Sequence, residues 1–186
     1  MFPVDLPAVV VMAALAAAGA AWDIRTGRIP NGLTVPALAV GLLYAARHDA
    51  LLSSLVGTFL VGGIYAVLFA LGGMGGGDVK FGAALGAWGG FPFSVVMFTL
   101  AALAGGVQAL WTLRHPVLSA SLAVLSGQGL DGAHEVFRSA YQPKQTVPYG
   151  VAIGAGAIGA LLWPVMPGVV GAWGREVYAL LAAIVG

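Results

Sequence analysis

Long stretches without a single charged residue constrain the fold of this chain more than any other feature of its sequence. One of them, Phe81–Leu113, runs for 33 residues. A helix rises about 1.5 Å per residue, so about 20 apolar residues cross a hydrocarbon core about 30 Å thick. The stretch is too long for one crossing. It predicts two helical segments separated by a break at Gly89-Gly90-Phe91-Pro92.

The overall composition agrees with a chain that belongs in lipid. Hydrophobic residues make up 60% of the 186 residues, charged residues only 8%, and the mean hydropathy is +0.95. Soluble domains are about 45–50% apolar and about 25% charged, so a water-soluble globule and a disordered chain are both excluded. The formal net charge of +1 argues against a nucleic-acid partner. The absence of cysteine excludes disulfides, Cys-ligated zinc and thiolate chemistry.

The charge-free runs predict an all-α, polytopic membrane bundle with about six transmembrane helices, forming a single domain over residues 1–186. The first apolar run follows Met1–Asp5, which lacks the basic residues of a cleaved signal peptide, so we expect it to remain as a span. The expected spans are Leu6–Trp22, Ile29–Ala46 with its helix starting near Leu33, Leu51–Leu71, the short Val79–Trp88, Phe93–Leu113 and Val147–Trp163.

Two further segments are expected outside these spans. The polar region at about 115–146 predicts a loop that carries a short amphipathic helix, Ala133–Tyr141. The tail 164–186 is apolar but carries Arg175-Glu176 near its middle. Either an interfacial helix or a seventh span is compatible with this tail.

The basic residues predict the orientation, because lysine and arginine accumulate in short cytoplasmic loops. Alternating the spans leaves Arg47 on one side of the membrane. Six basic residues fall on the other side: Arg25, Arg28, Lys80, Arg114, Arg138 and Lys144. We therefore expect that second side, with the loop at 115–146, to be cytoplasmic in a cell inner membrane.

Two of the acidic residues, Asp23 and Asp78, occur at junctions between apolar spans and on the same expected membrane face. Each could simply mark a helix end at the water boundary, where an acidic side chain also interacts favourably with a helix dipole. If packing brings the two carboxylates within a few ångströms, one keeps a proton while the other can take a proton from water. Such a pair could hydrolyse a peptide bond with no metal and no cofactor.

The residues around Asp78 fit the same chemistry. Gly75-Gly76-Gly77 leaves the preceding backbone free of side chains, so an extended peptide could approach it; a flexible loop is the alternative. Lys80 could stabilise a carboxylate or orient a substrate carbonyl, or it could be a lysine that extends to the interface. Histidines 48, 115 and 134 have no ligand spacing, so we expect no metal site.

Two motifs resemble those of the type IV prepilin peptidase family, the GxGD membrane aspartic proteases. One motif runs from Asp23 to Ile29-Pro30-Asn31, and the other is Gly75-Gly76-Gly77-Asp78-Val79-Lys80. A weaker match is Val147-Pro148-Tyr149-Gly150, similar to the family's Pro-x-Gly. The resemblance covers roughly residues 5–163.

The resemblance implies that Asp23 and Asp78 are the catalytic pair of an aspartic endopeptidase. The reaction would remove a short basic leader from a prepilin or pseudopilin at the cytoplasmic membrane face, typically after a glycine. The remaining motif residues would position the substrate: Pro30, Asn31, Gly75, Gly77, Lys80, Pro148 and Gly150. Larger members carry an N-terminal cysteine-containing, metal-binding domain and also methylate the new N-terminus. This chain is similar to the compact form associated with Flp-type pili or archaeal preflagellins, so we expect no methyltransferase activity.

The expected partners are a prepilin or pseudopilin helix, the lipid bilayer and the pilus assembly machinery, with no cofactor, no metal and no nucleic acid. Two other functions are compatible with the residues alone. Acids in membrane spans also mark ion pathways, as in a small proton- or ion-coupled transporter. A non-enzymatic membrane component of a pilus or secretion assembly is the other alternative.

Overall fold

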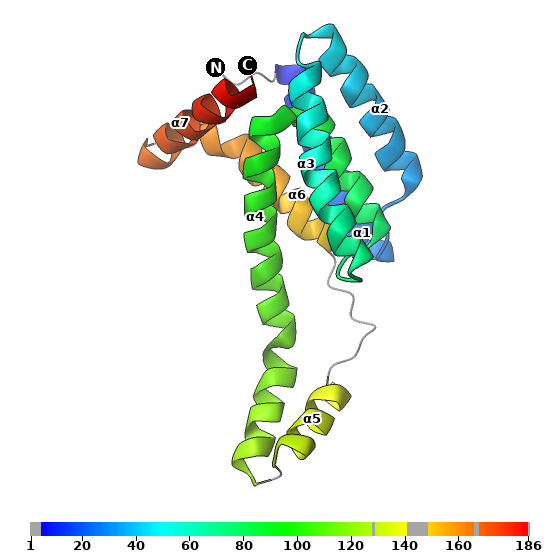
Figure 1. Ribbon diagram of the computed structural model, residues 1–186, viewed down its shortest axis with the longest axis vertical. Coiled ribbons are helices and arrows are strands. Elements are labelled where there is room, and N and C mark those ends of the chain that lie inside the picture. Colours follow the sequence, from blue (N-terminus) through cyan, green and yellow to red (C-terminus); the bar gives the residue numbers. More distant parts are fainter. Residues whose placement is uncertain (1–4, 128, 141–148, 166–167, 186) are drawn as a thin grey trace. The chain divides into compact units, whose positions relative to one another are not determined.

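The computed structural model describes residues 5–127, 129–140, 149–165 and 168–185, and every regular element in these ranges is helical. Within these described ranges, three helices are long and apolar enough to cross a membrane. The all-α membrane class is thereby confirmed, while the expected count of about six crossings stays a prediction. The elements are α1 Leu6–Thr26, α2 Asn31–Arg47, α3 Leu51–Ala70, α4 Gly76–Leu125, α5 Gly129–Ala140, α6 Tyr149–Leu162, the 3-10 turn η1 Trp163–Val165 and α7 Gly168–Val185 (Figure 1).

The end of α1 lies beyond the expected boundary at Trp22. The helix continues through Asp23 to Thr26 and stops at Gly27, whose φ of 63° is left-handed and whose N–H donates to the Asp23 carbonyl at 2.8 Å. This left-handed glycine cap satisfies a carbonyl of the last turn. Asp23 is therefore part of the helix, which fixes the direction in which its side chain points.

The break expected in the long uncharged stretch is present inside α4. Gly90 has φ 71° and ψ −172°, so the helical backbone is interrupted there. The N–H of Phe91 donates to Ser53 Oγ on α3 at 3.0 Å. Beyond this kink the helix continues to Leu125. The predicted end of this segment at Leu113 is therefore wrong. α4 runs through Arg114-His115-Pro116. Neither a charged side chain nor a proline ends a helix by itself while the surrounding backbone hydrogen bonds continue.

The chain forms two compact units. One comprises residues 1–104 and 148–186, and it contains α1 to α3, the N-terminal part of α4, α6, η1 and α7. The other comprises residues 105–147, with the rest of α4 and α5. Within this second unit, the guanidinium of Arg114 lies over the ring of Trp111, 3.4 Å from its centroid.

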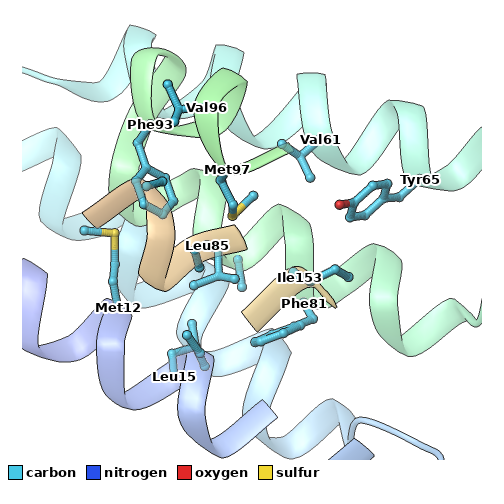
Figure 2. Close-up of a cluster of buried hydrophobic side chains, with 14 of the residues drawn as sticks. Met12, Leu15, Val61, Tyr65, Phe81, Leu85, Phe93, Val96, Met97 and Ile153 are labelled. Carbon is cyan, nitrogen blue, oxygen red and sulfur yellow. The ribbon is translucent and has the colours of Figure 1, made fainter. Parts of the chain in front are cut away.

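The core of the first unit joins α1, α3, α4 and α6. Figure 2 shows its buried side chains converging from these helices, among them Met12, Tyr65, Phe81, Met97 and Ile153. α1 packs along α6, and α2 packs along α3. Membrane helices gain little from apolar transfer between one another, so close packing of small residues replaces it.

Glycines provide these close approaches. A Cβ at Gly154 on α6 would lie 3.0 Å from the carbonyl oxygen of Ala16 on α1. A Cβ at Gly156 would lie 2.6 Å from the amide nitrogen of Ala101 on α4. The glycines of α6 therefore let it lie directly against two neighbouring helices, which brings its N-terminal end to the C-terminal end of α1.

Candidate active site

Asp23 points from the last turn of α1 toward the first turn of α6. Its side chain is 6% exposed, and its Oδ2 accepts a hydrogen bond from the N–H of Gly150 at 2.8 Å. The two residues are 127 positions apart in the sequence. The first amides of a helix have no partner within the helix and carry its positive dipole end. Asp23 thus supplies α6 with an acceptor, and α6 holds the Asp23 carboxylate in place.

Only glycine fits at position 150 in this arrangement. A Cβ there would lie 2.8 Å from Asp23 Oδ2 and 2.9 Å from Ile29 Cδ1. The Pro-x-Gly match of the sequence is therefore partly explained by contact with Asp23. Pro148 lies outside the described residues, and its expected role stays a prediction.

Asp78 is the third residue of α4, and its side chain turns back toward the start of the helix. It is 9% exposed, and its Oδ2 accepts a hydrogen bond from the N–H of Gly75 at 3.2 Å. The carbonyl of Gly75 in turn accepts from the N–H of Asp78 at 3.1 Å. This reciprocal pattern resembles one half of a capping box, in which an acidic residue at the third position binds the capping amide. Asp78 is therefore fixed by its own helix.

The loops that follow Asp23 and precede Asp78 touch each other. A Cβ at Gly77 would lie 3.0 Å from the carbonyl oxygen of Ile29 and 3.2 Å from its nitrogen, so the two backbones are in contact. Next to this contact, Lys80 Nζ donates to Asn31 Oδ1 at 2.8 Å. Asn31 is the first residue of α2, directly after Pro30. The fold thus brings the two sequence motifs together.

Both aspartates line one cavity of about 300 Å³. The other lining residues come from the two loops: Gly27, Arg28, Ile29, Asn31, Gly75, Gly76 and Gly77. A cavity with two carboxylates and an open glycine backbone can hold a water molecule and a peptide group between them. Such an arrangement is suited to general acid–base chemistry.

The sequence did not single out Arg28 as a lining residue of this cavity, nor the two tyrosines close to Asp78. Tyr65 on α3 and Tyr149 at the start of α6 meet edge to face, with ring centroids 6.2 Å apart. Both are near enough to Asp78 for its charge to act on them. Tyr149 lies within the Pro-x-Gly match, so the sequence motif could have identified it. Tyr65 belongs to an apolar helix and carries no such signal.

A model of the type IV leader peptidase family matches residues 10–110, more than half of the chain and a range that includes both aspartates. The chain is similar to leader peptidase HopD of Escherichia coli, with 37% identity over 92 residues that cover 45% of this chain and 59% of HopD.

Prepilin leader peptidase/N-methyltransferase of Burkholderia pseudomallei is 35% identical over 106 residues, which cover 50% of this chain and 34% of that protein. The protein of the same name from Stutzerimonas stutzeri is 35% identical over 102 residues, which cover 50% of this chain and 35% of that protein. The chain thus spans less than two thirds of the length of these relatives. No solved structure was found to match it.

Proposed function

The chain belongs to the type IV leader peptidase family, and from this we propose that it is a membrane aspartic endopeptidase that removes the short basic leader from prepilins or pseudopilins. The observation that carries the proposal is the shared cavity: Asp23 and Asp78 line the same space of about 300 Å³, although they belong to different helices. The names of its relatives, leader peptidase and prepilin leader peptidase, support the same substrate class.

In the proposed reaction, one carboxylate takes a proton from a water molecule held in the cavity. The water oxygen adds to the scissile carbonyl carbon while the other, protonated, carboxyl gives its proton to the carbonyl oxygen. The tetrahedral intermediate then collapses as the leaving nitrogen takes up a proton and the C–N bond breaks. The products are a leader with a new carboxylate and a pilin with a new amino terminus.

The motif residues have distinct parts in this proposal. Gly75 and Gly77 keep one wall of the cavity free of side chains, so an extended substrate backbone can lie against it. Asn31 and Lys80 hold the two loops together through their hydrogen bond. Gly150 fixes the Asp23 carboxylate. Pro30 is the N-cap of α2 and directly precedes Asn31, which lines the cavity.

We further propose that the cavity opens at the cytoplasmic face of the inner membrane, because six of the basic residues accumulate on that expected side. A prepilin helix would then reach the site from within the bilayer with its basic leader in the cytoplasm. The pilus assembly machinery would receive the processed product. The expected absence of methyl transfer stays a prediction, which the mass of the new N-terminus tests.

The test is a cleavage assay in membranes that contain the full chain and a prepilin. Asp23→Asn and Asp78→Asn should each lower the cleavage rate by at least about a hundredfold, because each removes one member of the acid–base pair. Asp131→Asn, on the separate helix α5, is the matched control and should cleave at the wild-type rate. Retained cleavage in either cavity variant would refute the mechanism.

A further inference from the structure

A second cavity of about 370 Å³ lies in the same unit as the aspartate cavity and shares no lining residue with it. Its polar lining consists of Asp5, Tyr44, His48, Asp49, Ser53 and Ser54. We propose that this cavity binds a primary ammonium group, supplied by the headgroup of an ethanolamine phospholipid or by a soluble amine. The inference does not depend on the proposed peptidase function.

The position of the cavity fits a lipid headgroup. Asp5 caps the start of α1, and Asp23 lies in its last turn. α1 has 21 residues and is apolar enough to cross a membrane, which corresponds to about 30 Å. The two cavities therefore lie at opposite ends of one membrane-crossing helix. The second cavity is at the depth of the headgroups of the opposite leaflet.

The charge of the lining favours a cation. Asp5 and Asp49 both contribute carboxylates, whereas the residues that the structure places around this cavity include no lysine or arginine. The hydrogen bond from Tyr44 holds the pKa of the Asp5 carboxyl below its usual value, so Asp5 is ionised at neutral pH. Asp5 and Asp49 are both exposed, and two carboxylates around one cavity attract a cation more strongly than either would alone.

The aromatic side chains hold the carboxylate of Asp5 and form an apolar wall. The hydroxyl of Tyr44 donates to Asp5 Oδ2, and its ring stacks with His48 and Trp88 at centroid distances of 4.2 and 5.3 Å. Trp88 is anchored in turn, because its Nε1–H donates to the Ala37 carbonyl at 2.8 Å. Rings of this kind contact the methylene groups of an aminoethyl chain, and their faces attract a neighbouring ammonium.

A phosphate alone fits this lining poorly, because carboxylates repel it. The phosphate of an ethanolamine phospholipid would find a cationic partner outside the lining instead, at Arg47, which is exposed at the end of α2 and directly precedes the lining residue His48. A zwitterionic headgroup thus meets charges of both signs at this helix end. A glycerol headgroup offers hydroxyl donors but no positive charge to offset the two carboxylates.

The test measures which lipid the full chain retains. The protein is purified in a maltoside detergent and phosphate buffer, incubated with equal amounts of phosphatidylethanolamine and phosphatidylglycerol, and separated by size-exclusion chromatography before its lipids are quantified. Wild-type protein should retain more phosphatidylethanolamine. Asp5→Asn and Asp49→Asn should each lower the ratio of the two lipids by about tenfold, since each loses an ionised acceptor.

These substitutions preserve the local backbone. Asparagine is as good a helix N-cap as aspartate, so α1 keeps its cap at position 5. Asparagine also tolerates the left-handed φ of 54° found at Asp49. Asp131→Asn on α5 removes a charge outside the cavity and should retain the lipids in the wild-type ratio.

A second measurement separates the two sources of the ammonium group. If the lipid is the source, retained phosphatidylethanolamine raises the unfolding temperature, and only a large excess of ethanolamine displaces it. If a soluble amine is the source, ethanolamine raises the unfolding temperature of wild-type protein but not of Asp5→Asn. Equal retention of both lipids by wild-type protein, together with no response to ethanolamine, would overturn the proposal. An unchanged lipid ratio in the Asp5→Asn, Asp49→Asn double variant would also overturn it.

Discussion

Asp23 Oδ2 lies 2.8 Å from the amide nitrogen of Gly150, and this hydrogen bond joins the end of the first helix to the beginning of the sixth. The bond satisfies one of the backbone N–H groups in the first turn of α6 and holds the Asp23 carboxylate at the wall of the cavity that Asp78 also lines. The position of one proposed catalytic side chain therefore depends on a glycine that is far away in the sequence.

Gly150→Ala is expected to impair catalysis while the protein still folds. The added Cβ would lie 2.8 Å from Asp23 Oδ2, so the carboxylate must move, and a displacement of about 1 Å can lower a rate by about a hundredfold. The cleavage rate at saturating prepilin measures the effect. Gly63→Ala is the matched control, because a Cβ at Gly63 meets nothing within 4 Å. Equal rates for Gly150→Ala and wild type would contradict the positioning role.

Gly77→Ala is expected to push the two loops apart. Its Cβ would press on the backbone of Ile29 at 3.0 and 3.2 Å, and backbone atoms cannot rotate away as a side-chain tip can. We expect about a tenfold lower cleavage rate, a smaller loss than for Gly150→Ala because the contact is not with a carboxylate. Gly32→Ala in the first turn of α2 has open space around its Cβ and serves as the control.

The hydrogen bond between Lys80 and Asn31 can be tested by a double-mutant cycle. Both side chains are exposed, so the bond should contribute only about 0.5–1.5 kcal/mol. Lys80→Met and Asn31→Ala should each slow cleavage modestly, and the double variant should be no slower than the worse single variant. Fully additive losses would mean that Lys80 acts on the substrate rather than through Asn31.

The pair Tyr44–Asp5 predicts a stability that depends on pH. The hydrogen bond from Tyr44 lowers the pKa of Asp5 from its usual 3.8, so the folded state favours the ionised carboxylate. The resulting stabilisation is present above pH 3.8 and is lost as the pH falls through the lowered pKa. Tyr44→Phe should therefore lower the unfolding temperature in detergent at pH 7, and this difference should shrink progressively below about pH 4.

Tyr178→Phe provides the control for this pH effect. The Tyr178 hydroxyl donates to the backbone carbonyl of Ala160 at 2.8 Å, and a carbonyl does not titrate. Loss of the Tyr178 hydroxyl should lower the unfolding temperature by the same amount at pH 7 and below about pH 4. If the difference in unfolding temperature between wild type and Tyr44→Phe is also independent of pH, the hydrogen bond from Tyr44 is not linked to the ionisation of Asp5.

The sequence predicted the elements of this fold where a local signal exists. The glycines before Pro92 indicated a break, and the kink at Gly90 confirms it. The ends of α1 and α4 were predicted too early, because a charged residue indicates polarity but not the loss of backbone hydrogen bonds. α1 ends only where Gly27 adopts a left-handed conformation, and α4 extends past Arg114 to Leu125.

The candidate site was predictable only in part for a related reason. Spacing and resemblance singled out Asp23 and Asp78, but the hydrogen bond to Gly150 and the contact between Gly77 and Ile29 join segments that are remote in the sequence. Such contacts depend on how helices pack, which no local pattern encodes. The second cavity was missed for the same reason, since Asp5, Tyr44 and Trp88 meet only in the folded bundle.

The bond between Asp23 and Gly150 also has a consequence for biosynthesis. Gly150 is added 127 positions after Asp23, which takes about 6 to 25 s at about 5–20 residues per second. During that time a nascent chain can hold both aspartates in the membrane while Asp23 lacks its amide partner. The hydrogen bond that holds Asp23 at the cavity wall forms only when α6 is inserted. A ribosome-bound chain that ends before Tyr149 therefore carries both aspartates while the Asp23 carboxylate is not yet held by α6.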